Sequence, residues 1–223
     1  MKFDSVTRTI AATVVVAASF GLAACSTPEP AEERDPNDVR VAFYGDSYTL
    51  GTGATDADNR WSTVVSEQRD WSEFNPSVNG LGFINNRTTF GDGDLPSQII
   101  ADDPDIVFVT MGLNDNFSFG ARASDIQAQI TDDFDRLTTA LPDARFIVVE
   151  PFWYTDERPD SVETIISWVE AAAAASGADY IPGASHWIEG HPEWMASDGL
   201  HPNDDGYAEM ATQMDQALRT LGL

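Results

Sequence analysis

The chain has 223 residues, 42% of them hydrophobic, and its 37 acidic and 12 basic side chains give a formal net charge of −25. The length and the apolar fraction suit one α/β domain with short additions, and the single cysteine excludes an intrachain disulfide or a zinc site built on cysteines. Because so negative a surface repels polyanions, a nucleic-acid-binding function is excluded as well.

The N-terminal segment has the pattern of a secretion signal. Lys2 and Arg8 precede an apolar and small-residue run over 10–22, which is too short to cross a bilayer. The run closes on Leu-Ala-Ala-Cys, which resembles the bacterial lipobox, whose cysteine becomes the lipidated first residue of the mature chain. We therefore expect residues 1–24 to be removed as a signal peptide and Cys25 to anchor a lipoprotein at the outer face of the cytoplasmic membrane or in the cell envelope. The alternative is an ordinary signal peptide and a secreted protein.

Residues 25–38 predict a tether between the lipid and a folded domain. The segment after Cys25 is rich in Pro, Glu and Asp and has no apolar periodicity, which is typical of disorder. A flexible coil of this length reaches about 20 Å on average, enough to hold a domain just off a membrane. The domain itself is then expected over residues 39–223.

Beyond the tether, strand-like and helix-like segments alternate. Buried parallel strands are predicted where β-branched and aromatic residues cluster, over 39–44, 105–110 and 144–150, with weaker strands near Ser77-Val78 and Tyr180-Ile181. Helical patterns occupy 60–68, 124–141, 161–176 and 204–221. This alternation predicts an open parallel sheet with helices on both faces, in which ligands bind beyond the carboxyl ends of the strands.

The first two strong strands are each followed by a residue suited to catalysis. Gly45-Asp46-Ser47 comes after the first strand, and a sharp turn at the glycine would lift the Ser47 hydroxyl to the edge of the sheet as a candidate nucleophile. The alternative for Ser47 is a turn serine that caps a helix. Asn114 follows the strand over 105–110, where its side-chain amide can donate to a developing oxyanion.

A third polar motif lies near the C-terminus. Asp198 precedes His201 by three residues on a predicted loop. On a tight turn the carboxylate is close enough to accept a hydrogen bond from the imidazole and fix its tautomer. The pair is therefore a candidate for the base of a nucleophilic mechanism.

In this order, the G-D-S, G-x-N-D and D-x-x-H motifs resemble the SGNH hydrolases, the GDSL family of esterases and lipases. The resemblance covers about residues 39–221 and matches the family's serine, asparagine and histidine to Ser47, Asn114 and His201. It implies a three-layer α/β/α sandwich with a flavodoxin-like parallel sheet, in agreement with the alternation above. It also implies a carboxylic ester hydrolase that needs no metal or organic cofactor and acts on small-molecule, glycan or lipid esters.

The oxyanion glycine of the family has two candidates here. Asn75 lies five residues before Gly80, the usual spacing of the family's second motif, and this favours Gly80. Gly82 remains the alternative candidate because it lies only two residues after Gly80. Tyr48 stands where the family's name has leucine, at a position that varies.

The resemblance implies a two-step acyl transfer. His201 takes the proton of Ser47, which attacks the ester carbonyl, and Asp198 orients His201 and stabilises its imidazolium form. The backbone N–H groups of Ser47 and Gly80 and the Asn114 side chain stabilise the tetrahedral oxyanion. Water then releases the acid.

Other polar residues near these motifs receive structural interpretations. Asp46 and Asp115 lie inside the motifs, and we expect them to orient loops through hydrogen bonds. His186 and His191 lack the spacing of a zinc-binding helix, which Pro192 would interrupt, so no metal site is expected there.

Two tryptophans are candidate substrate-binding residues. Trp153 follows the strand over 144–150 and Trp194 precedes Asp198, so each could stack on a sugar ring or line an acyl channel; packing in the core is the alternative. The acidic charge disfavours anionic substrates such as acyl-CoA thioesters, and we expect a neutral ester, either short acyl groups on a carbohydrate or a small lipid ester. The competing function is a non-catalytic envelope lipoprotein that binds glycan or lipid. No sequence feature indicates the oligomeric state.

Overall fold

The structure is a computed structural model that describes residues 38–90 and 93–223. The expected signal peptide, Cys25 and nearly all of the expected tether lie outside the described residues. Within the described ranges, no helix is both long enough and apolar enough to cross a membrane.

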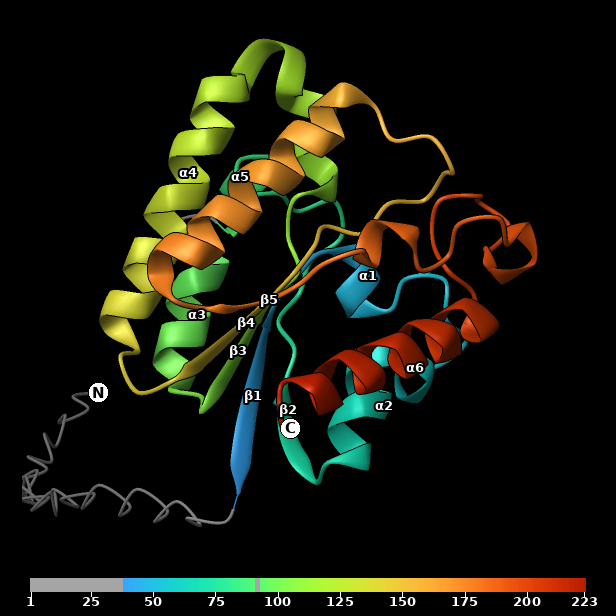
Figure 1. The fold of residues 1–223 in the computed structure, drawn as a ribbon, viewed down its shortest axis with the longest axis horizontal. Coiled ribbons are helices and arrows are strands. Elements are labelled where there is room, and N and C mark those ends of the chain that lie inside the picture. Colours follow the sequence, from blue (N-terminus) through green and yellow to red (C-terminus); the bar gives the residue numbers. More distant parts are fainter. Residues whose placement is uncertain (1–37, 91–92) are drawn as a thin grey trace, which may run out of the picture. The chain divides into compact units, whose positions relative to one another are not determined.

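Five parallel strands form one sheet in the order β2-β1-β3-β4-β5 (Figure 1). Their bounds are β1 (Val39–Tyr44), β2 (Trp71–Phe74), β3 (Ile106–Val109), β4 (Arg145–Val149) and β5 (Asp179–Ile181). The chain reverses its direction of winding between β1 and β3, and sheets of this type bind ligands in the crevice at that point. The order is the flavodoxin-like one, which confirms the predicted fold class.

Helices cover both faces of the sheet (Figure 1). One face carries α2 (Trp61–Gln68) and α6 (Asp204–Thr220), and the other carries α3 (Leu95–Asp102), α4 (Phe119–Ala140) and α5 (Asp160–Ser176). The four-residue α1 (Ser47–Leu50) follows β1 directly. The molecule therefore has the three layers that the resemblance implied.

The side chains of β1 show how the two cores are divided. Val41 and Phe43 belong to the core beneath α2 and α6, whereas Ala42 and Tyr44 belong to the core beneath α3, α4 and α5. Successive side chains of a strand point to opposite faces, and a central strand covered by helices on both sides must be apolar throughout. This is why residues 41–44 read as a continuous apolar run.

The prediction of a strand near Ser77-Val78 is wrong. The second strand is β2, whose mixed sequence Trp71-Ser72-Glu73-Phe74 pairs with β1 on one side only. As an edge strand it is not buried on all sides and lacks the apolar run of a central strand. Val78 lies in the loop that follows, where its N–H donates to the Gly45 carbonyl at 3.3 Å. The weaker strand expected at Tyr180-Ile181 is confirmed as β5.

The sequence pattern misses α3 and starts α4 too late. The N-terminal signals of α3 are present, because Asp94 accepts the Ser97 N–H at 2.9 Å and Pro96 lies in the first turn. Its eight residues, however, make only about two turns, too few for a clear helical period. Helix α4 begins at Phe119 rather than at residue 124, and a kink at Arg122, with φ of −136°, separates its first turn from the regular part.

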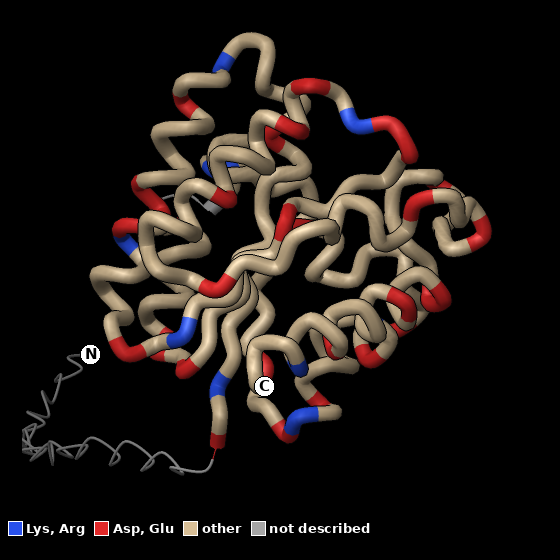
Figure 2. Tube along the Cα trace, in the orientation of Figure 1, with Lys and Arg blue, Asp and Glu red and all other residues tan. Residues whose placement is uncertain are grey.

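A buried ionic network ties β1 to the α3–α4 layer. The Asp133 side chain on α4 is fully buried, accepts the Tyr44 hydroxyl at 2.6 Å and receives two hydrogen bonds of 2.6 Å from the Arg87 guanidinium. Asp94 joins the network through Arg87 at 2.8 Å and Arg136 at 2.6 Å. The network fixes the segment after β2 in place. Many other acidic residues lie along the outer helices and loops (Figure 2).

Replacing Asp133 by Ala should lower the free energy of unfolding by about 3–5 kcal/mol, because the Arg87 guanidinium would lose its buried partner. Urea unfolding followed by circular dichroism measures the change. Asp125→Ala on the same helix removes an exposed ion pair with Arg122 and should have little effect. Equal losses in the two variants would contradict the role given to the network.

Candidate active site

Ser47 lies in a tight turn between β1 and α1. Gly45 is required there, because a Cβ at this position would lie 2.5 Å from the Cβ of Thr49. The Asp46 side chain caps α1 by accepting the Tyr48 N–H at 3.0 Å. Ser47 is thus the first residue of the helix and not its cap, and its side chain is almost fully buried.

Asp198 and His201 form a hydrogen-bonded pair on the loop before α6. His201 Nδ1 lies 2.7 Å from Asp198 Oδ2, and Asp198 Oδ1 accepts the backbone N–H groups of Leu200 at 2.9 Å and His201 at 3.0 Å. The hydrogen bonds from the His201 backbone and ring, in that order, lower the pKa of Asp198 to about 2. The group is therefore a carboxylate at neutral pH, which assigns the ring proton to Nδ1 and leaves Nε2 able to accept one.

Close contacts hold the Ser47 helix beside the His201 loop. The Tyr48 hydroxyl donates to the Leu200 carbonyl at 2.7 Å, and the centroids of the Tyr48 and His201 rings are 6.1 Å apart. Gly53, at φ of +100°, allows the backbone to pass closely, since a Cβ there would lie 2.3 Å from the Pro202 carbonyl oxygen. Sequence reasoning gave Tyr48 no role; a tyrosine inside the first motif is the signal that could have indicated one.

Asn114 lies in the loop after β3, and its side-chain amide is held from two sides. Nδ2 donates to the Leu81 carbonyl at 2.9 Å and to Asp46 Oδ2 at 3.1 Å. The loops after β1, β2 and β3 therefore meet at this one amide. Because both of its hydrogens have acceptors, a developing oxyanion at this position would take over one of the two bonds.

Asp115 shapes the loop that carries the two candidate glycines. Its carboxylate accepts three backbone N–H groups of that loop, from Phe83 at 2.7 Å, Ile84 at 3.0 Å and Asn85 at 3.2 Å. A Cβ at Gly82 would lie 2.5 Å from Asp115 Oδ1, and the Gly82 N–H donates to the Asn85 carbonyl at 2.9 Å. The Gly82 N–H and Cα are thus taken up by the packing of the loop, whereas Gly80 lies in a half-buried turn at φ of +69°.

The two carboxylates inside the motifs are both buried. Burial raises the pKa of Asp46 to about 7 and also raises the pKa of Asp115, although hydrogen bonds from backbone N–H groups oppose the shift in both. Their hydrogen bonds to the loops after β1 and β2 confirm the orienting role predicted for them.

The structure corrects the interpretation of Trp153. Its side chain is only 3% exposed and belongs to the core, and its Nε1 donates to the Thr155 hydroxyl and the Glu157 carbonyl, both at 2.9 Å. The ring is therefore not available to a substrate. Trp194 differs, because it is partly exposed and stacks on His191 with the ring centroids 3.6 Å apart.

A family model described as the GDSL-like Lipase/Acylhydrolase family matches residues 43–209. The chain belongs to this family. This GDSL-family protein is 27% identical over 188 residues to the GDSL lipase Rv0518 of Mycobacterium tuberculosis. The aligned region covers 78% of this chain and 79% of the lipase. Family membership makes the protein a carboxylic ester hydrolase.

Solved structures share the fold of this GDSL-family hydrolase. The esterase EstA from Pseudoalteromonas sp. is 16% identical, with a TM-score of 0.65 over 82% of this chain and 98% of that chain. A family two carbohydrate esterase from Cellvibrio japonicus is 19% identical, with a TM-score of 0.64 over 82% of this chain and 61% of that chain.

We expect the free energy of unfolding of Asp46→Asn, measured relative to that of the wild type, to increase as the pH rises. The folded protein keeps the Asp46 proton up to a pKa of about 7, whereas the unfolded chain releases it near pH 4. Ionisation of the buried group therefore removes up to about 4 kcal/mol of stability between about pH 4 and pH 7. Urea unfolding across this range measures the difference.

The control is Asp205→Asn, which changes an exposed carboxylate in the first turn of α6. A difference between Asp46→Asn and the wild type that stays constant over the whole pH range would contradict the raised pKa.

Proposed function

We propose that this hydrolase cleaves esters by acyl transfer through Ser47, with His201 as general base and acid and Asp198 as the residue that orients His201. The observation that carries the proposal is the 2.7 Å hydrogen bond between Asp198 Oδ2 and His201 Nδ1, in a loop that Tyr48 ties to the Ser47 helix. This arrangement leaves His201 Nε2 to exchange the reacting proton.

The proposed reaction has two steps. His201 Nε2 removes the Ser47 hydroxyl proton as Oγ attacks the ester carbonyl, and the negative charge passes to the carbonyl oxygen. His201 then gives the proton to the departing alcohol oxygen, and Ser47 is left acylated. In the second step the same nitrogen takes a proton from water, whose oxygen attacks the acyl carbon. The acyl–Oγ bond then breaks, His201 returns the proton to Ser47 Oγ, and the carboxylic acid leaves.

The oxyanion donors in this proposal are the backbone N–H groups of Ser47 and Gly80 and the amide of Asn114. Ser47 opens a helix, so its N–H has no acceptor within that helix. The 3.1 Å bond from Asn114 to Asp46 is the longer of its two and the one that a developing charge would replace, since catalytic hydrogen bonds often form fully only with the substrate in place. One such donor typically contributes about 10²–10³ in rate.

The substrate class is proposed as a neutral ester, carried either by a carbohydrate with short acyl groups or by a small lipid. The net charge of −25 disfavours anionic esters, including acyl-CoA. A carbohydrate esterase is among the proteins that share this fold, which is consistent with an acylated sugar as substrate.

The wild-type protein should hydrolyse acetylated sugars or short aryl esters with higher kcat/KM than long-chain acyl-CoA, and Ser47→Ala should abolish turnover while leaving the fold intact. Loss of a triad serine in another hydrolase costs about 10⁶ in kcat. Initial rates over a substrate panel, with circular dichroism of the variant, test both statements.

Three outcomes would change the assignment. More than a tenth of the activity left in Ser47→Ala would place the nucleophile elsewhere. Preference for acyl-CoA over every neutral ester would overturn the substrate class. Binding of glycan or lipid without turnover of any ester would favour the alternative, a non-catalytic envelope lipoprotein.

The location proposed for the enzyme is the cell envelope, with lipid on Cys25 holding the domain at the membrane. The Leu-Ala-Ala-Cys motif after an apolar run supports this proposal. Mass spectrometry of the mature protein should find an acylated N-terminal cysteine, and Cys25→Ser should move the protein from the membrane fraction to the soluble one, since two or more acyl chains anchor stably. An unmodified N-terminus beyond residue 25 would support plain secretion.

A further inference from the structure

A cavity adjoins the loop that carries the proposed catalytic pair. Its volume is about 420 Å³, within the usual range of small-molecule sites. Ser197 and Gly199, which flank Asp198, form one wall, and Tyr154 and Asp156 from the loop after β4 form another. The remaining lining residues come from the segment before this loop: Ile188, Gly190, His191, Pro192, Met195 and Ala196.

We propose that this cavity holds the alcohol part of the ester and that this alcohol is a sugar ring. The inference rests on the proposed role of His201. The group that protonates the leaving alcohol must lie next to it, so the alcohol belongs on the His201 side of Ser47. The carbonyl oxygen of the ester belongs on the opposite side, near Gly80 and Asn114.

The loop after β4 links the cavity to Tyr48, the residue after Ser47. Tyr48 lies against His201 and also stacks on Phe152, with ring centroids 5.7 Å apart and an angle of 17° between the planes. Phe152 is two residues before Tyr154, which lines the cavity. The wall of the cavity is therefore built on the same packed unit that positions the His201 loop.

The lining combines apolar surface with hydrogen-bonding groups, as a sugar ring does. Apolar surface comes from Tyr154, Ile188 and Met195, and hydrogen-bonding groups come from Asp156, His191 and Ser197. A pyranose presents C–H groups on its faces and hydroxyl groups around its edge, so it can pack on the first set and bond to the second. A plain fatty alcohol would form no hydrogen bonds with Asp156, His191 and Ser197 and so would gain no binding energy from them.

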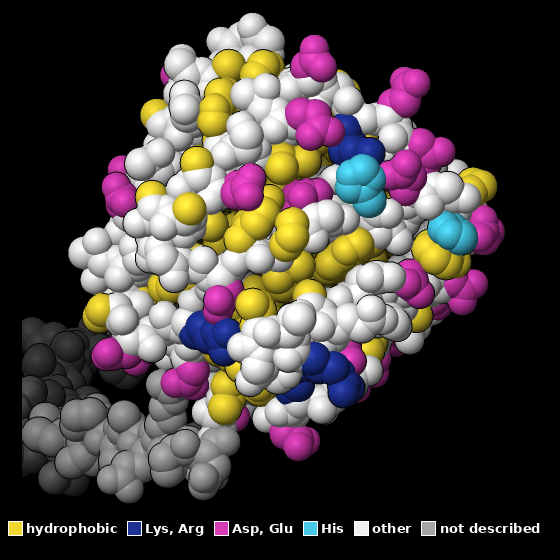
Figure 3. Space-filling model, viewed as in Figure 1, with side chains coloured by type: hydrophobic (Ala, Val, Ile, Leu, Met, Phe, Trp, Pro, Cys, Tyr) yellow, Lys and Arg dark blue, Asp and Glu magenta, His cyan; other side chains and the backbone are white. Residues whose placement is uncertain are grey.

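The charge of the cavity argues against a phosphorylated alcohol. Within the described part of the chain no arginine lines it, and Asp156 lies in its wall. On the right of Figure 3, acidic and histidine side chains gather over the loops at this end of the molecule, with a basic patch beside one of the histidines. A lipid or nucleotide phosphate would meet repulsion here, whereas a neutral hydroxyl group can donate to the carboxylates.

Two of the polar groups are held in fixed positions. His191 is stacked on Trp194, with an angle of 11° between the planes, and its Nδ1 lies 2.8 Å from Glu193 Oε1, so Nε2 is the nitrogen left for a ligand. Asp156 Oδ1 accepts the Gly190 N–H at 2.8 Å and joins two walls of the cavity. Groups ordered before binding lose less entropy when a ligand arrives.

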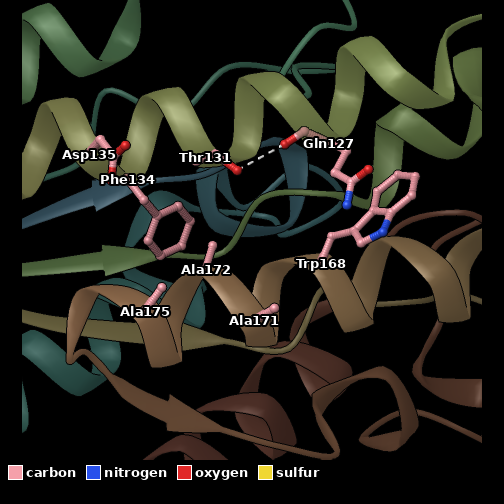
Figure 4. A pocket seen from close by; sticks show the side chains of 8 residues that line it. All are labelled: Gln127, Thr131, Phe134, Asp135, Trp168, Ala171, Ala172 and Ala175. Carbon is pink, nitrogen blue, oxygen red and sulfur yellow. Dashed lines mark hydrogen bonds between the residues drawn. The ribbon is translucent and has the colours of Figure 1, made fainter.

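A second cavity, between α4 and α5, does not suit this ligand (Figure 4). Its volume is only about 160 Å³, and its lining is dominated by Phe134, Trp168 and three alanines. All of its lining residues belong to the two helices, and none follows the carboxyl end of a strand.

The test compares two esters of acetic acid: an acetylated methyl glucoside, whose alcohol fills the cavity, and ethyl acetate, whose alcohol does not. His191→Ala should reduce kcat/KM for the sugar ester about tenfold more than for ethyl acetate, mainly through KM, as expected for a lost hydrogen bond and stacking contact. Methyl glucoside should inhibit ethyl acetate hydrolysis competitively in the wild type and more weakly in His191→Ala.

His186→Ala is the matched control. His186 is similarly exposed, 53% against 44% for His191, and its Nδ1 also binds one carboxylate, that of Glu189, but it does not line the cavity. It should change the ratio of the two kcat/KM values less than twofold.

The outcomes separate this inference from the proposed mechanism. Ser47-dependent hydrolysis of ethyl acetate, combined with equal losses for both esters in His191→Ala or with no inhibition by methyl glucoside, would overturn the sugar subsite alone. Activity that persists in Ser47→Ala would instead overturn the mechanism on which the subsite rests.

Discussion

The hydrogen bond from the Tyr48 hydroxyl to the Leu200 carbonyl joins segments 152 residues apart in the chain, and the proposed chemistry depends on that junction. Ser47 follows the central strand β1, whereas Asp198 and His201 precede the last helix. The loops bearing them become neighbours because parallel strands deliver their carboxyl ends to one edge of the sheet. Tyr48 then holds the two loops together, since its ring packs against both His201 and Phe152.

Buried carboxylates organise much of this edge and the layer behind it. Asp46 and Asp115 accept backbone N–H groups of the loops that carry the motifs, and Asp133 anchors the segment after β2 through Arg87. A carboxylate accepts several hydrogen bonds at once, so it can fix an irregular loop whose backbone N–H groups lack the regular partners of a helix or sheet. Desolvation is the cost, and the raised pKa values of Asp46 and Asp115 record it.

The charge of the molecule and the chemistry of its cavity point the same way. Acidic residues are spread along the outer helices and loops (Figure 2). The cavity next to the Asp198–His201 loop is lined by carboxylate, hydroxyl and aromatic groups. Such a surface excludes polyanions at a distance and offers acceptors to neutral hydroxyl groups at contact. A tethered enzyme of this kind would meet neutral glycan and lipid esters at the cell envelope, which is the setting proposed for it.

The sequence by itself determined the parallel sheet, four of its strands and the motif residues Ser47, Asn114, Asp198 and His201, because these signals are local: apolar runs, helical periods and short spacings. It could not place β2 or α3, which are short and mixed in composition. Nor could it show that Trp153 is buried. The choice of Gly80 over Gly82 as oxyanion donor rests on the spacing from Asn75 and stays a prediction. Burial and loop geometry depend on contacts between distant segments, such as Asp115 against Gly82 and Tyr48 against Leu200. Such contacts exist only in the folded chain. Whether an N–H group is hydrogen-bonded, or a ring is buried, depends on which distant residues the tertiary fold places next to it.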